Sequence, residues 1–152
     1  MNVKTLRLLL LQLAGVTLVA AFAHAGEWQT DYEHALATAK ETKKNVLLNF
    51  TGSDWCPPCI AMNRNVFSKD AFKEFAQKHL ILVEVDFPQR KQLPPKVAQQ
   101  NDRLARQYEV EQAPTMFLLG PDGKVLGKFS GYSGEGPTEI IAWIEKQSGK
   151  QP

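Results

Sequence analysis

Two cysteines hold the reactive chemistry of this chain, and both stand in the segment Trp55-Cys56-Pro57-Pro58-Cys59. Thiols at this spacing, at the start of a helix, can close a small disulfide ring and open it again. A helix N-terminus stabilises an anion, so the first sulfur can exist there as the attacking thiolate. We predict that Cys56 is a nucleophile and that Cys59 resolves the mixed disulfide that Cys56 forms. This exchange needs no cofactor and no metal.

The same pair of thiols has alternative uses. A haem attachment site would place a histidine directly after Cys59, where the chain has Ile60, and a zinc site would need further ligands. A copper(I) site built from both sulfurs with His34, His79 or Met62 is one alternative. A structural disulfide is another, although so small a ring removes little entropy from the unfolded chain. A non-catalytic domain that serves only for docking is the third.

The composition excludes other classes of protein. The chain has 152 residues, of which 43% are hydrophobic and 22% charged, as in a globular domain. Lys and Arg number 18 against 16 Asp and Glu, and Lys4 and Arg7 account for the excess. The remaining charges balance, so no basic field is available to attract nucleic acid. Two cysteines are also too few for a disulfide-stapled mini-protein.

The N-terminal segment is typical of a secretory signal peptide. Its two cations precede an apolar run over residues 8–22, and Ala23-His24-Ala25 supplies small residues for cleavage. The run is shorter than the roughly 20 residues of a membrane span, although an uncleaved anchor is the alternative. We expect a cleaved signal peptide over residues 1–25 and one domain over residues 26–152. Export to the periplasm or outside the cell would give the cysteine pair a redox role.

Apolar periodicity and chain breakers predict alternating helices and strands. Helices are expected at residues 31–42, from the cysteine pair onward, at 69–78, at 94–108 and from 137 to about 149, and strands at 45–50, 80–87, 115–119 and 125–130. Thr30 and Glu33 predict a capping box for the first helix, and Ser68 predicts a cap for a later one. Strands joined through helices favour parallel pairing, whereas the turn at residues 120–123 predicts an antiparallel hairpin. This order predicts an α/β domain with a mixed sheet between helices.

A set of segments far apart in the sequence resembles the thioredoxin superfamily, most of all its exported bacterial members with a Trp-Cys-x-x-Cys motif. The segments are residues 50–59, which end in the cysteine pair, Ala113-Pro114-Thr115 at a strand start, and Gly131-Tyr132. The resemblance spans about residues 28–148. It implies a thioredoxin-like three-layer sandwich with a mixed central sheet of about four strands. It also implies a thiol–disulfide oxidoreductase that exchanges disulfides with exported proteins.

The resemblance further implies roles for individual residues and partners. Pro114 is expected to be a cis-proline that faces the disulfide, and Ala113 to offer its backbone N–H and C=O to an extended substrate. Trp55 and Tyr132 are expected to flank the sulfurs with apolar surface. The implied partners are protein disulfides and a membrane-bound thiol carrier that donates electrons, and we expect a monomer.

The chain departs from the family at the residues around the sulfurs. Asn49 stands where many thioredoxins carry a buried acid, and an amide cannot take up the proton of the second cysteine. Glu84 is a candidate substitute, with a solvated strand residue as the alternative. Pro57 and Pro58 lack N–H groups, so the Cys56 thiolate has fewer donors than in a strong oxidant. We therefore hypothesise that the reductase direction is favoured.

Two features beside the motif concern its surroundings. We expect the Asp54 carboxylate to lie in water, where its charge would disfavour a nearby thiolate. The stretch at residues 89–100 is longer than a short thioredoxin needs. We interpret it as a surface insertion, with a specificity or partner-docking element as the alternative.

Overall fold

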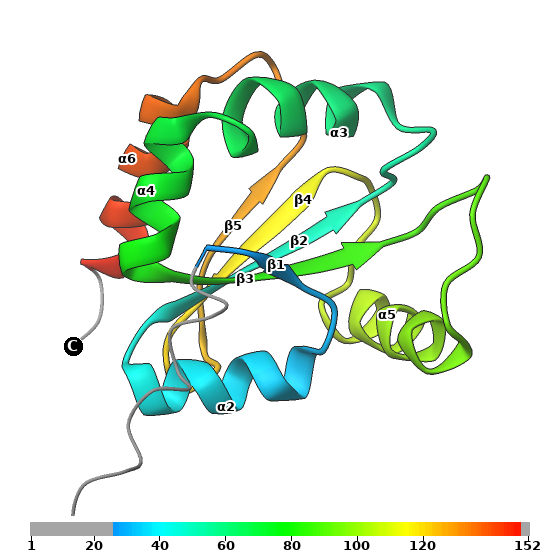
Figure 1. Ribbon diagram of the computed structural model, residues 1–152, viewed down its shortest axis with the longest axis horizontal. Helices are drawn as coiled ribbons and strands as arrows, with labels where there is room; N and C mark the ends of the chain where they lie inside the picture. The colour runs from blue at the N-terminus through cyan, green and yellow to red at the C-terminus, as the bar shows by residue number, and fades with distance from the viewer. Residues whose placement is uncertain (1–25, 150–152) are drawn as a thin grey trace, which may run out of the picture.

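Five strands form one mixed sheet in the order β1-β3-β2-β4-β5 (Figure 1). The structure, a computed structural model, describes residues 26–149, so the predicted signal peptide lies outside the described residues. The strands are β1 (Trp28–Gln29), β2 (Asn45–Thr51), β3 (Leu80–Asp86), β4 (Thr115–Leu119) and β5 (Val125–Ser130). Strand β3 runs parallel to β1 and β2, and β4 runs antiparallel to β2 and β5. The predicted mixed sheet and its hairpin are confirmed.

Helices cover both faces of the sheet, which confirms the three-layer sandwich. The helices are α2 (Tyr32–Thr42), α3 (Pro57–Met62), α4 (Asp70–His79), α5 (Pro95–Gln107) and α6 (Pro137–Ser148), and a π-helical turn, η1 (Asn63–Phe67), continues α3. Helices α3, α4 and α6 lie on one face, and α2 and α5 on the other (Figure 1). Alternate residues of β2 serve the two cores: Leu48 packs in the α2 and α5 layer and Leu47 in the opposite one.

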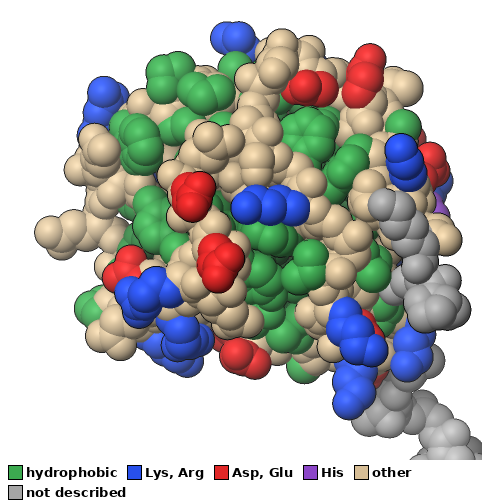
Figure 2. Space-filling model, turned by 180° about the vertical axis from the view of Figure 1, so that it is seen from behind, with side chains coloured by type: hydrophobic (Ala, Val, Ile, Leu, Met, Phe, Trp, Pro, Cys, Tyr) green, Lys and Arg blue, Asp and Glu red, His purple; other side chains and the backbone are tan. Residues whose placement is uncertain are grey.

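Charged side chains of both signs surround the apolar ones on the surface. Figure 2 shows Lys and Arg together with Asp and Glu around hydrophobic side chains on the rear face of the molecule. Within the described residues, no helix is long and apolar enough to span a membrane.

Strand β1 was not predicted, and it adds a fifth strand to the four expected. It has two residues, which pair with Leu82 and Val83 of β3. A strand this short has no alternation that could distinguish it from a loop. It therefore owes its conformation to pairing with the edge of β3.

Two predicted helix caps were wrong by one residue. Asp31, not Thr30, caps α2, because its carboxylate accepts the His34 N–H at 3.0 Å. A negative charge at this helix end is more favourable than a hydroxyl. Ser68 does not cap α4, which begins after Lys69 without a side-chain cap. The Ser68 N–H instead bonds to the Asn63 carbonyl and closes η1.

Strands β2 and β3 end side by side because they are parallel and in register. Thr51, the last residue of β2, pairs with Asp86, the last residue of β3. Beyond Thr51 the chain enters the loop that leads to Cys56, and beyond Asp86 it enters the loop that leads to α5. The carboxyl edge of the parallel strands therefore gathers both loops, as sites in α/β proteins usually require.

Candidate active site

The two cysteines form a disulfide at the start of α3. Their Cα atoms lie 5.3 Å apart. Cys56 is the N-cap residue of α3, and its Sγ accepts the Cys59 N–H at a distance of 3.3 Å. Pro57 and Pro58 occupy the first two helical positions without N–H groups, so Cys59 supplies the first amide of the helix. The helix end thus directs one backbone donor at the Cys56 sulfur.

The start of β4 lies against this disulfide. The peptide bond between Ala113 and Pro114 is cis. The Ala113 carbonyl oxygen lies 3.7 Å from Cys56 Sγ. Pro114 is buried, and its carbonyl accepts the Gly131 N–H at 2.8 Å. The structure therefore brings Ala113 and Pro114 to the sulfur that the sequence predicts to be the nucleophile.

Trp55, which precedes Cys56 in the chain, is exposed, whereas the Tyr132 hydroxyl is held by hydrogen bonds. The Trp55 side chain is 41% exposed, and its Nε1–H donates to the Phe87 carbonyl at 2.6 Å. The Tyr132 hydroxyl lies 3.0 Å from the Glu135 carbonyl and accepts from Asn65 Nδ2 at 3.3 Å. Tyr132 thus joins the loop before α6 to η1, beyond the cysteine pair. Its expected place beside the sulfurs stays a prediction.

A cavity of about 90 Å³ lies beneath Cys59. Its lining residues are Trp28, Asn49, Thr51, Ser53, Cys59, Ile60, Asn63, Phe67 and Glu84. Asn49 is buried, and among the described residues its Oδ1 has no hydrogen-bond partner. Glu84 is half-buried and pairs with Asn49 in the register of the two strands. The cavity therefore joins a thiol, an amide oxygen and a carboxyl group.

Burial raises the pKa of the Glu84 carboxyl above its ordinary value. The negative charge of Asp86 adds to this rise, and the positive charge of Lys91 opposes it. A carboxylate in such a setting is a stronger base than one in water. Glu84 is therefore not the solvated strand residue that the sequence analysis gave as the alternative.

The ligands considered for copper lie in separate elements. His34 belongs to α2, which covers the opposite face of the sheet, and His79 ends α4 with its ring centroid 4.7 Å from that of Phe75. Met62 is buried in the core. Within residues 26–149, no group of three or more His, Cys, Asp or Glu side chains could hold a metal ion.

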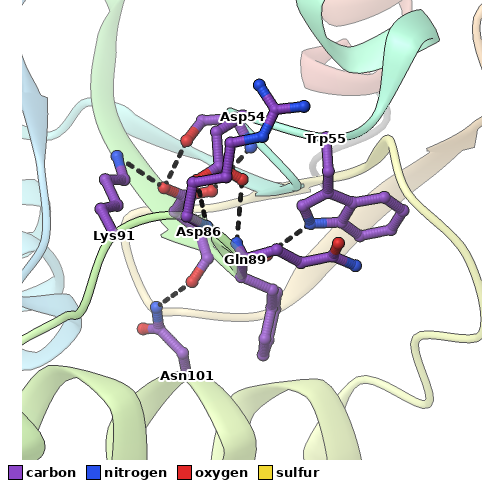
Figure 3. Close-up of polar contacts among 9 residues, drawn as sticks. Asp54, Trp55, Asp86, Gln89, Lys91 and Asn101 are labelled. Carbon is purple, nitrogen blue, oxygen red and sulfur yellow. Dashed lines mark hydrogen bonds and ion pairs between the residues drawn. The ribbon is translucent and has the colours of Figure 1, made fainter.

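Gly52, Ser53 and Asp86 also belong to this end of the sheet, and the sequence analysis did not single them out. Figure 3 shows Asp86 among the side chains and backbone groups around Trp55. The signal for Asp86 was its place at the carboxyl end of a predicted parallel strand, next to the strand that leads to Cys56. Gly52 gave no signal, because its role depends on where the Trp55 ring lies.

A disulfide at a helix start, beside the proline at the entry of a neighbouring strand and on a three-layer α/β sandwich, defines a thiol–disulfide oxidoreductase. Residues 32–148 match the family described as Thioredoxin-like domain. The chain belongs to this family.

Relatives agree with this class. The chain is 39% identical to the Disulfide bond reductase DsbH of Chlamydia pneumoniae over 114 residues, which cover 75% of this chain and 68% of that protein. It is 29% identical to the Thioredoxin-related protein DsbJ of the same organism over 137 residues, which are 88% of this chain and 39% of that protein. A solved structure described as DsbH Oxidoreductase superposes with a TM-score of 0.76 at 33% identity, covering 91% of this chain and 94% of the other.

Proposed function

We propose that this protein reduces disulfides of exported proteins, with Cys56 as the nucleophile. The observation that carries the proposal is the Cys56 sulfur, which lies at the α3 N-terminus and 3.7 Å from the Ala113 carbonyl. In the reduced protein, the Cys56 thiolate attacks one sulfur of a substrate disulfide. A mixed disulfide forms and the other substrate sulfur leaves as a thiolate, which takes a proton from water.

The second step completes the transfer of two electrons from the two cysteines to the substrate. Cys59 loses its proton, and its thiolate attacks Cys56 Sγ. The bond between Cys56 and the substrate breaks, the substrate sulfur leaves as a thiolate that takes a proton from water, and the Cys56–Cys59 disulfide of the structure is formed. The substrate is then fully reduced and the protein oxidised. A dithiol donor, which we infer to be a membrane-bound thiol carrier, restores the two thiols by the same exchange in reverse.

Glu84 is the proposed acceptor of the Cys59 proton. The carboxyl group and the thiol line the same cavity, whose volume of about 90 Å³ has room for water. The unpartnered Asn49 Oδ1 can hold such a water by accepting a hydrogen bond from it. The raised pKa of Glu84 suits a base that takes up a proton and later returns it to solvent.

An extended polypeptide is the proposed substrate. The backbone at Ala113 can pair with a strand of the substrate next to the reacting sulfur. Trp55 and Ile60, exposed by 41% and 45%, offer apolar surface around the disulfide. Tyr132 extends this surface on the side of the loop before α6. One chain contains all of these groups, so the proposed site needs no residue from a second copy, which is compatible with the expected monomer.

Two observations support the reductase direction. Pro57 and Pro58 leave the Cys59 N–H as the donor to the Cys56 sulfur, so a thiolate there receives little stabilisation and the disulfide is favoured. The relative DsbH of Chlamydia pneumoniae is named a disulfide bond reductase. The predicted signal peptide over residues 1–25 supports export to the periplasm, where substrate disulfides form.

Trapping with Cys59→Ala tests the proposal. The variant should attack substrates through Cys56 but cannot release them, so exported proteins should accumulate as mixed disulfides. Mass spectrometry after non-reducing electrophoresis would identify the partners. Cys56→Ala with an intact Cys59 is the matched control and should trap far less, because Cys59 is not the N-cap of α3 and lines the cavity with Asn49 and Glu84. Equal trapping by both variants, or by neither, would contradict the assignment of Cys56 as the nucleophile.

A further inference from the structure

We propose that Asp86 is a positioning residue that holds the active-site loop (residues 52–56) against the β3–α5 loop (residues 87–94), and that both loops form the protein-substrate site. The inference rests on the proposed function, because it concerns how a polypeptide substrate is received. It concerns contacts that join the ends of two parallel strands (Figure 3).

Asp86 binds both loops through its carboxylate. One oxygen accepts the Ser53 N–H at 2.9 Å, and the other accepts the Ser53 hydroxyl at 2.7 Å. Lys91 Nζ lies 2.9 Å from this second oxygen. The carboxylate is only 4% exposed, so water cannot replace these partners at little cost. On the backbone side, the Asp86 carbonyl accepts Asn101 Nδ2 of α5 at 2.9 Å.

Asp54 and Trp55 make further hydrogen bonds between the two loops. The Asp54 carboxylate accepts the N–H groups of Gln89 and Arg90 at 2.9 and 2.8 Å, and these donors lower its pKa. The carboxylate stays at the surface, as expected, while these two bonds connect it to the neighbouring loop. The Trp55 indole donates to the Phe87 carbonyl. Ser53 is thus bound to the end of β3, and Asp54 and Trp55 are bound to the loop that follows it.

The Trp55 ring packs directly against the backbone of the active-site loop at Gly52. A Cβ atom at Gly52 would lie 2.5 Å from the Trp55 ring, so only glycine permits this approach. The ring stays exposed on its other side, where a substrate would meet it. The position of this apolar surface therefore depends on the two loops being held together.

Charge does not explain the arrangement. Arg90 and Lys91 of the β3–α5 loop lie near Asp54, Asp86 and the half-buried Glu84, so charges of both signs are mixed here. A cluster of mixed sign attracts a charged partner only weakly over distance. The effect of this cluster is therefore geometric. The stretch at residues 89–100, which the sequence analysis interpreted as a surface insertion, contributes to the loop that supports the active-site loop.

The experiment compares Asp86→Asn and Ser53→Ala with the matched control Asp122→Asn. Asp122 also accepts a backbone N–H and pairs with a lysine, but in the turn between β4 and β5. Single-turnover rates are measured with a cyclic peptide that has one disulfide and with hydroxyethyl disulfide, which has no backbone to bind. We expect Asp86→Asn to slow the peptide reaction about tenfold and the small disulfide no more than about twofold. Ser53→Ala, which removes one bond to Asp86, should show a smaller change of the same kind.

Hydrogen exchange of the indole N–H groups gives a second readout. In Asp86→Asn, the Trp55 indole proton should exchange at least about tenfold faster, while those of Trp28 and Trp143 serve as internal references. Equal slowing with both disulfides, or unchanged peptide rates and unchanged indole exchange, would overturn the inference. If the unsubstituted protein reduced neither disulfide, the proposed function would fail. The indole exchange would still test whether Asp86 holds the loops together.

Discussion

At a helix N-terminus, the N-cap side chain accepts hydrogen bonds from the second and third amides of the helix. In α3 these positions are Pro58 and Cys59, and only Cys59 has an N–H, which lies 3.3 Å from Cys56 Sγ. The sequence of the motif therefore removes one of the two donors that could stabilise a Cys56 thiolate. This loss connects a single residue type to the direction of electron flow, because a less stable thiolate favours the disulfide.

Pro58→Ala should restore the missing donor. A hydrogen bond to a charged group contributes about 1.5–3 kcal/mol, so the midpoint of the Cys56 alkylation profile should fall by about one to two pH units. The reduction potential should become more oxidising in parallel. Pro57→Ala is the matched control, because the first helical amide is not directed at the cap side chain. Alkylation rates of the reduced protein across a pH series measure the effect, and an equal shift in both variants would contradict it.

At the scale of the elements, the cap of α2 differs from the predicted one, Thr30. The structure assigns the cap to Asp31. Asp31→Ala should lower the free energy of unfolding by about 1 kcal/mol, whereas Thr30→Ala should change it by less than about 0.5 kcal/mol. Urea denaturation of both variants measures the difference. The reverse order would restore the capping box that Thr30 and Glu33 suggested.

Elements defined by local pattern were predictable, and features defined by tertiary register were not. The cysteine pair, the hairpin at residues 120–123 and the parallel pairing of β2 with β3 follow from spacing, turn residues and connection length. Strand β1 and the bonds of Asp86 do not, because each depends on a partner distant in the sequence. The same holds for the cavity around Asn49, since its depth is set by α3 lying over the sheet.

At the scale of the whole molecule, the two faces of the sheet differ: one is an apolar core, and the other has polar groups near the cysteines. The face under α2 and α5 is packed with apolar side chains along the length of β2. On the opposite face, the apolar packing of Leu47 and its neighbours gives way at the carboxyl end to Asn49 and Glu84. A half-buried carboxyl group at this end is costly when ionised, which is the cost we expect for the proposed role of Glu84 as a base for Cys59.

Glu84→Gln should therefore make the protein more stable and a poorer enzyme. The folded-state pKa of Glu84 is raised, so its stabilising effect is present below the ordinary value of 4.5 and is lost as pH rises through the folded value. A neutral amide avoids this loss. The denaturation midpoint of Glu84→Gln should exceed that of the unsubstituted protein at pH 7, and the difference should vanish in acid.

The same variant should slow release of the substrate from Cys56. Without a base in the cavity, the Cys59 proton has no acceptor there, and such proton transfers contribute about a hundredfold or more to rates. Mixed disulfides should accumulate in reactions quenched during turnover. Raising the pH should relieve the defect, because Cys59 then loses its proton to solvent without a base. Glu74→Gln, on the exposed side of α4, controls for the loss of a charge. A Glu84→Gln protein that is no more stable at pH 7 and releases substrate normally would remove Glu84 from the proton path and leave the cavity without a role in catalysis.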